Sequence, residues 1–114
     1  MLFIGFGQDY EKAQEVGICL FTLQGLELKH GKIKLQDMKT LISHTRPVEV
    51  YYDRFRTPTT LINYFKATNI QKHSLHIQPD HKFLVKSNFP ELVDVSKETH
   101  IAVALLIIHL QKSL

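Results

Sequence analysis

Residues 45–58, TRPVEVYYDRFRTP, decide how the chain is organised. Pro47 disfavours helix in the residue before it and favours an extended entry into residues 48–52. That segment is rich in β-branched and aromatic residues and is predicted to be a strand. Thr57-Pro58 is typical of a helix start, because Thr57 can accept a hydrogen bond from a free amide and Pro58 has no amide to leave unpaired. The stretch therefore predicts a βα unit in the middle of the chain.

Three strand-like segments precede this unit. Residues 2–7 and 16–22 are short runs of aromatic and β-branched side chains joined by a polar turn, which is typical of strands. Residues 26–33 follow the turn at Gln24-Gly25 and alternate apolar with polar side chains, which indicates a half-buried strand. We expect the three strands to form an antiparallel meander.

Helical spacing of apolar residues predicts three helices. One begins at Leu35 and ends before Pro47, and a second follows Pro58 with its apolar stripe at Leu61, Ile62, Tyr64 and Phe65. The third spans residues 97–112, with Ser96 as its N-cap. Because this helix is apolar on nearly all sides, we expect it to be heavily buried or covered by something outside the chain.

Residues 74–77 and 82–85 are predicted to be short strands on either side of Pro79-Asp80. The resulting order, β-β-β-α-β-α-β-(β)-α, predicts a single α/β domain over residues 1–114. It is typical of a ribonuclease H-like mixed sheet, in which a three-strand antiparallel meander is followed by βα units. Residues 48–52 are expected to be the central parallel strand.

Composition limits the classes of protein that fit. The chain has 114 residues, a formal charge of +3 and a pI near 9.0, which permits a nucleic-acid neighbour but is better explained by solvated lysines. Cys19 is the only cysteine, so we expect a buried structural thiol and no intrachain disulfide. No signal peptide is predicted, and the apolar run 101–108 is shorter than the roughly 20 residues that span a bilayer. We expect a soluble intracellular domain without membrane contact.

A ribonuclease H-like fold raises the hypothesis of a metal-dependent nuclease, which needs clustered carboxylates to hold two cations. The first predicted strand contains no acid, and Asp9 lies beyond its end. Alternation places Glu49 on a face that need not meet Glu27 or Asp9. Surface acids are therefore the favoured interpretation, and we predict no catalytic residue, metal ion or cofactor.

Two other patterns are weak. Gly5-Phe6-Gly7 lacks the third glycine and the helix of a dinucleotide loop, so glycines at a strand edge or bulge are favoured. His73, His76 and His81 with Asp80 have no spacing that is typical of a zinc site, and solvated loop residues are the favoured interpretation.

Arginines flank the predicted central strand. Arg46 precedes it, and Arg54 and Arg56 follow it, so the two groups should lie at opposite ends of the sheet. Arg54 and Arg56 are candidates for binding a phosphate or an acidic partner. The alternative is that they confer solubility and form salt bridges to Asp53.

Two segments resemble the connector domain of MutS-type mismatch-repair proteins. That family has a strand G-[IV]-[AC], which matches Gly17-Ile18-Cys19, and a later strand that begins R-P-x-E-[IV], which matches RPVEV at residues 46–50. The helix within residues 98–112 resembles the one that leads from the connector toward the lever region. The resemblance covers residues 1–68 and 98–112. Residues 70–95 form a shorter segment than in many relatives.

The resemblance implies a non-catalytic, ribonuclease H-like connector between the mismatch-reading domain and the lever and ATPase parts of a parent protein. It also implies a docking surface for a MutL-type partner, indirect contact with DNA through the parent, and a nuclear location in a eukaryote or a cytoplasmic one otherwise. Val48 and Val50 would fill the layer between sheet and helices. The chain contains no Walker A loop. A small nuclease and a free-standing interaction module remain alternatives.

Overall fold

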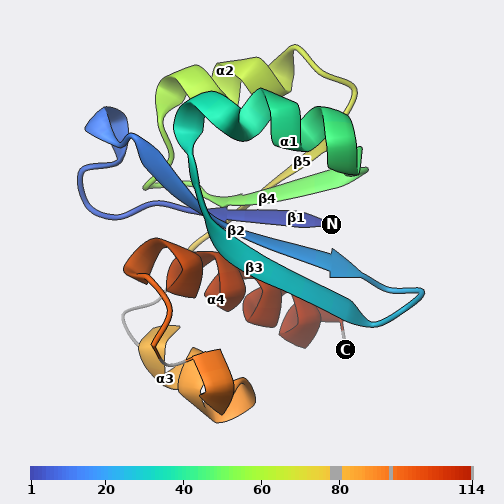
Figure 1. Cartoon of the computed structure of the whole chain (residues 1–114), viewed down its shortest axis with the longest axis vertical. Coiled ribbons are helices and arrows are strands. Elements are labelled where there is room, and N and C mark those ends of the chain that lie inside the picture. The colour runs from blue at the N-terminus through green and yellow to red at the C-terminus, as the bar shows by residue number, and fades with distance from the viewer. Residues whose placement is uncertain (78–80, 93, 114) are drawn as a thin grey trace.

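The computed structural model describes residues 1–77, 81–92 and 94–113, which form a five-stranded mixed sheet with helices on both faces (Figure 1). Short 3-10 turns cover Tyr10–Lys12, Leu35–Asp37 and Pro90–Leu92. The longer elements are β1 (Leu2–Gly5), β2 (Glu15–Thr22), β3 (Glu27–Lys34), α1 (Met38–Thr45), β4 (Glu49–Asp53), α2 (Thr59–Lys66), β5 (Gln71–Leu75), α3 (His81–Asn88) and α4 (Lys97–Ser113).

The strand order in the sheet is β3-β2-β1-β4-β5. β2 pairs antiparallel with β1 and with β3, so the predicted meander is confirmed. β4 pairs parallel with β1 and with β5, as expected for βα units. The α/β class is therefore confirmed. The middle position belongs to β1, however, while β4 is the parallel strand beside it.

Alternating side chains give the sheet two apolar faces. Leu2, Ile4 and Val50 belong to the core under α1 and α2. Phe3 and Tyr51 point the other way into the core under α4 and α3. Figure 1 shows α1 and α2 together on one side of the sheet and α4 on the other, with α3 beyond it. The strands that are buried on both faces thus separate two helix layers.

α4 packs directly on the sheet because two strand positions lack side chains. A Cβ atom on Gly5 would overlap the backbone of Glu98 and Ala102, and one on Gly17 would overlap the backbone of Glu98 and Thr99. The expected role of Gly5 at a strand edge or bulge is therefore wrong, since β1 is the middle strand. The glycine is needed for close approach of a helix.

The start of α4 is fixed by hydroxyl groups. Ser96 Oγ accepts a hydrogen bond from the amide of Thr99 at 3.1 Å, which confirms the predicted N-cap. Thr99 Oγ1 donates to the carbonyl oxygen of Gly31 on β3 at 2.9 Å. Residues 101–107 are all buried, so the expected burial of this helix is confirmed as well. Among the described residues, no helix has the length and apolarity needed to cross a bilayer.

Two predicted strands differ from the structure. Residues 82–85 lie in the helix α3, because His81 and Val85 bury one helical face against α4. The strand predicted at 74–77 is β5, which begins earlier, at Gln71. The turn predicted at Pro79-Asp80 falls outside the described residues.

Thr57 does not cap α2. Its Oγ1 donates to the carbonyl oxygen of Asp53 at 2.7 Å, and the residue preceding the helix is Pro58. The first helical residue is held instead by Glu11, whose Oε1 accepts hydrogen bonds from the amide and the hydroxyl of Thr59, both at 3.1 Å. A carboxylate at this position also suits the positive end of the helix dipole.

Candidate functional site

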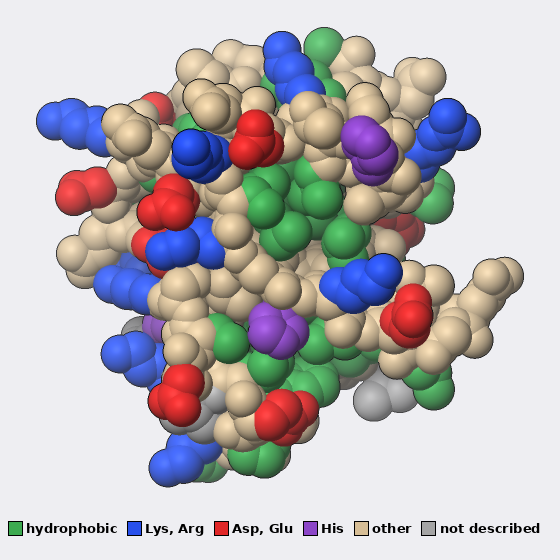
Figure 2. Space-filling model, in the orientation of Figure 1, with side chains coloured by type: hydrophobic (Ala, Val, Ile, Leu, Met, Phe, Trp, Pro, Cys, Tyr) green, Lys and Arg blue, Asp and Glu red, His purple; other side chains and the backbone are tan. Residues whose placement is uncertain are grey.

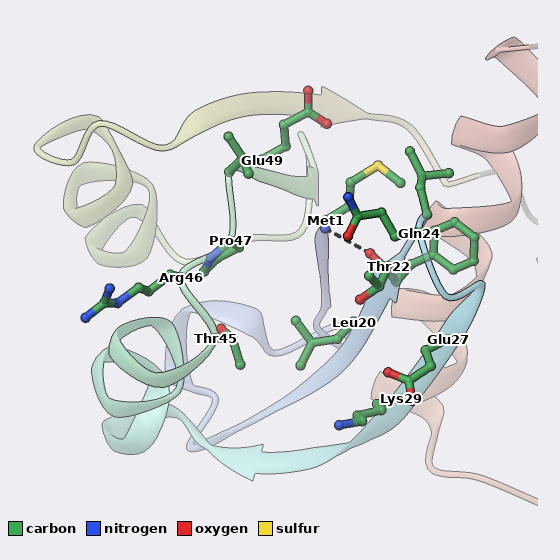
Figure 3. A pocket seen from close by; sticks show the side chains of 13 residues that line it. Met1, Leu20, Thr22, Gln24, Glu27, Lys29, Thr45, Arg46, Pro47 and Glu49 are labelled. Atoms are coloured by element: carbon green, nitrogen blue, oxygen red, sulfur yellow. Dashed lines mark hydrogen bonds between the residues drawn. The ribbon is translucent and has the colours of Figure 1, made fainter.

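A groove lies at the end of the sheet where β1 and β4 begin and β2 ends. We call it the strand-end groove; it has a volume of about 660 Å³. Its lining residues are Met1, residues 20–24, Glu27, Lys29 and residues 45–49. Figure 3 shows side chains of the β2–β3 turn on one side of it and the segment from Thr45 to Glu49 on the other. The site is thus formed by the β2–β3 turn and by the connection between α1 and β4.

The groove combines apolar walls with charged ends. Val48 is 75% exposed and Leu23 is 65% exposed, so the expectation that Val48 fills the layer under the helices is wrong. The residue lies before β4 begins and faces the groove, whereas Val50 is fully buried. Figure 2 shows hydrophobic side chains gathered on this face between α1 and the β2–β3 turn. Such a surface is suited to a partner with apolar and charged groups.

Arg46 connects α1 to the groove in a conformation that is uncommon for its residue type. Its φ of 46° and ψ of 57° place it in the left-handed region, and its amide donates to the carbonyl oxygen of Ile42 at 2.8 Å. The residue therefore ends α1 in the way that glycine usually does. In Figure 3 its side chain extends away from the hollow.

Glu49 joins the groove to a polar cluster beneath α4. Tyr51 Oη donates a hydrogen bond to Glu49 Oε2 at 2.7 Å and lies 3.4 Å from His109 Nε2. The Tyr51 ring stacks on Phe3 at 4.5 Å and on His73 at 4.6 Å between centroids. We call Glu49, Tyr51, His73 and His109 the Tyr51 cluster.

The surroundings of this cluster shift the pKa values of Tyr51 and His109. Burial raises the pKa of Tyr51, and the hydrogen bond to Glu49 and the charge of that carboxylate raise it further. Burial lowers the pKa of His109, and the nearby Glu49 offsets part of this change by raising it. His73 Nε2 lies 3.8 Å from Glu49 Oε1, which suits an ion pair of the protonated imidazole but is too long for a hydrogen bond. A phenol whose pKa moves away from neutrality is a poor proton donor to a substrate.

The three acids of the nuclease hypothesis are only partly brought together. Glu27 and Glu49 both border the strand-end groove, although alternation gave no reason to expect this. Asp9 lies elsewhere, in a separate hollow with Gly7 and Glu98. Over residues 1–77, 81–92 and 94–113, no three His, Cys, Asp or Glu side chains lie close enough to hold a metal ion. The proposed ligand Asp80 is outside those ranges.

The predicted partner residues Arg54 and Arg56 lie at the opposite end of β4 from Arg46, as expected. Between them Phe55 is 60% exposed and meets His76 edge-on, at 5.0 Å between centroids. The Arg54 guanidinium lies 5.9 Å from the centroid of the Phe55 ring. We call residues 54–56 with His76 the arginine tip.

The alternative of salt bridges to Asp53 is wrong for the part of the chain that the structure describes. The Asp53 side chain is 2% exposed, and its Oδ1 accepts a hydrogen bond from the amide of Phe55 at 2.9 Å. Neither arginine has a carboxylate within ion-pair distance among the described residues. Arg54 is exposed and Arg56 is half-buried.

Sequence reasoning did not find the Tyr51 cluster. Glu49 and Tyr51 are two residues apart on one strand, so period-2 alternation was a usable signal for that pair. His73 and His109 come from β5 and α4, and no local pattern links them to Tyr51.

Comparison of the chain with family models, with curated proteins and with solved structures found no match.

Proposed function

We propose that the chain is a non-catalytic connector or adaptor domain of a MutS-like DNA mismatch-repair or meiotic-recombination protein. It relays conformational change between other domains of that parent and docks a MutL-type partner, while DNA is contacted through the parent. Support comes from the antiparallel meander followed by parallel βα units, which the resemblance implies. Gly17-Ile18-Cys19 lies in β2, and RPVEV leads into β4.

The observation that carries this proposal is the direct packing of α4 on the sheet. At Gly5 and Gly17 the backbone of α4 leaves no room for a methyl group. Packed cores deform little, so a rotation of α4 must move the sheet with it. This coupling suits a module whose last helix leads toward a lever and whose parent supplies the ATPase.

The arginine tip is the proposed docking surface for the MutL-type partner. It presents an exposed aromatic ring between two arginines, and aromatic residues and arginine are enriched where binding energy concentrates. Hydrogen bonds of the Asp53 and Thr57 side chains fix its backbone, so little conformational freedom is lost on binding. An acidic segment of the partner would pair with both guanidinium groups.

The test is a pull-down of a purified MutL-type protein by the chain. We expect binding, and we expect Arg54→Glu with Arg56→Glu to abolish it. Arg46→Glu is the matched control, because Arg46 lies at the other end of β4 and should leave binding unchanged. A chain that captures no MutL-type protein would contradict the proposal, and loss of binding in the Arg46 variant would place the docking surface at the other end of β4.

One observation favours the alternative of a small ribonuclease H-like nuclease, since Glu27 and Glu49 share a groove. Cleavage of nucleic acid that requires Mg²⁺ and is lost on Asp9→Asn, Glu27→Gln or Glu49→Gln would support it. A free-standing interaction module is the other alternative, and the exposure of Phe55 favours it equally. Binding of an acidic peptide without binding of a MutL-type protein would support that function.

A further inference from the structure

A second hollow lies between α3 and the start of α4, about 340 Å³ in volume. Its lining residues are His81, Lys82, Lys86, Val95, Lys97 and His100. Five of these six side chains are basic, and among the described residues no carboxylate lines it. Small-molecule sites have volumes of about 300–1,000 Å³, so the hollow is large enough for a small ligand.

The placement of the lysines follows from helix geometry. Lys82 and Lys86 are four residues apart on α3, so their Cβ atoms lie about 5–6 Å from each other on one face. Lys97 and His100 are three residues apart at the start of α4 and share a face in the same way. The like charges of Lys82 and Lys86 at this spacing destabilise α3. A bound anion would relieve this repulsion.

His100 reports the same imbalance of charge. Burial lowers its pKa, and the positive charges of His81 and Lys82 lower it further. Its Nδ1 is buried without a hydrogen-bond partner among the described residues. The charged groups that face it across the hollow are His81, Lys82 and Lys86 from α3 and Lys97 from α4. Of these groups, His81 and Lys82 favour the neutral imidazole.

We propose that this hollow binds a phosphate-type dianion through Lys82, Lys86 and Lys97. Lysine ammonium groups bind phosphate as point charges, and a protonated imidazole adds an N–H donor. The dianion is either free phosphate or the phosphate monoester of a nucleotide, since both present the same oxygens. The site lies on α3 and α4, away from the arginine tip and the strand-end groove, and it is independent of the connector proposal.

Isothermal titration of the whole chain with sodium phosphate, against sodium chloride of equal ionic strength at pH 7, tests the proposal. We expect saturable binding at one site. The double variant Lys82→Ala with Lys86→Ala should raise Kd by roughly 10-fold or more, because two of the three ammonium groups that would bind the dianion are lost. The matched control Lys34→Ala with Lys66→Ala makes the same change in net charge at distant exposed positions and should leave Kd unchanged.

Circular dichroism of each variant establishes that it folds. If the double alanine variant at Lys82 and Lys86 does not fold, Lys82→Gln with Lys86→Gln takes its place. Absence of phosphate binding to the native chain would overturn the proposal. Equal weakening by the Lys34 and Lys66 control would overturn it too, because the effect would then come from net charge alone.

Two further ligands identify the source of the dianion. Adenosine 5′-monophosphate binding more tightly than phosphate, with no binding of adenosine, indicates a nucleotide monoester. Equal affinity for the monophosphate and for phosphate indicates free phosphate. Adenosine binding as tightly as its monophosphate contradicts the proposal, because the base would then be recognised.

The imidazole of His100 gives a readout at the site itself. Phosphate should raise its pKa in an NMR titration, since the anion stabilises the protonated ring. His44 on α1 is the control, because it is exposed and hydrogen bonded to the carbonyl oxygen of Thr40. An unchanged His100 pKa at saturating phosphate would place the anion elsewhere and overturn the assignment.

Discussion

Gly17 on β2 lies directly against the backbone carbonyl of Glu98 at the start of α4. The contact joins the sheet to the helix through backbone atoms, which cannot move aside as a flexible side chain can. Gly5 on the neighbouring strand makes the same kind of contact with Glu98 and Ala102. The fit of helix to sheet therefore depends on two missing methyl groups.

Gly17→Ala should lower the free energy of unfolding by about 3 kcal/mol, because the added methyl group overlaps backbone and forces α4 away from the sheet. Urea unfolding monitored by circular dichroism measures the change. Gly31→Ala on β3 is the matched control, since no described atom lies within 4 Å of its Cβ position. We expect the control to change stability by less than about 0.5 kcal/mol. Equal effects of the two substitutions would contradict the proposed packing.

Glu11→Ala should destabilise the chain by about 1 kcal/mol, which is the usual value of a lost helix cap. The carboxylate holds the amide and hydroxyl of Thr59 at the start of α2. Glu15→Ala is the control, because Glu15 pairs with Lys32 in an exposed ion pair at 3.6 Å and such pairs contribute little. Thermal unfolding compares the two variants. A cap role for Glu11 is contradicted if they unfold at the same temperature.

The cap also shows where local sequence reasoning ends. Thr57-Pro58 predicted the start of α2 within two residues, because proline and a hydroxyl residue mark helix starts locally. The group that caps the helix comes from Glu11, 48 residues earlier in the chain. Thr57 turns back to Asp53 instead. No pattern within residues 45–58 contains this information, since it depends on how the connection after β1 folds over α2.

The helix α3 was predicted as a strand. Residues 82–85 form a window too short to distinguish a period of 2 from a period of 3.6. α3 packs against α4 on one side only. His81 and Val85 lie on that side and are buried, whereas Phe83 lies on the other side and is 68% exposed. The strands and α4 were predictable because their patterns are long or strongly apolar. The Tyr51 cluster was not, since three separate elements form it.

Tyr51→Phe should cost about 1 kcal/mol at neutral pH, where it removes the hydrogen bond to Glu49. The native chain should also lose stability as pH rises above about 10, the pKa of tyrosine in an unfolded chain. The folded pKa lies above that value, so the folded state keeps a proton that the unfolded state releases, and stability falls with rising pH.

Unfolding free energies between pH 8 and pH 11.5 test this dependence. The loss above pH 10 should be smaller in Tyr51→Phe than in the native chain, because the variant has no hydroxyl to ionise. Tyr52→Phe is the control, since Tyr52 is half-buried and has no hydrogen bond among those found for the described residues. Parallel pH profiles for the native chain and Tyr51→Phe would show that the hydroxyl is not protected.

Cys19 should react slowly with a thiol reagent such as DTNB in the folded chain at pH 8. The side chain is fully buried, and burial raises the pKa of the thiol to about 12, so the reactive thiolate is scarce. In denaturant the same cysteine should react stoichiometrically. Rapid reaction of the folded chain would mean that the layer between β2 and α4 opens readily.

Phe55→Ala should weaken binding of the MutL-type partner by about 2 kcal/mol, or roughly 30-fold in Kd, because central aromatic residues carry much of the binding energy of interfaces. The ring is 60% exposed, so stability should change by less than about 0.5 kcal/mol. Phe83→Ala is the matched control, since Phe83 is equally apolar, 68% exposed and located on α3. Affinity by surface plasmon resonance distinguishes the variants. If both bind the partner as the native chain does, the arginine tip is not the docking surface, and the strand-end groove becomes the surface to test next.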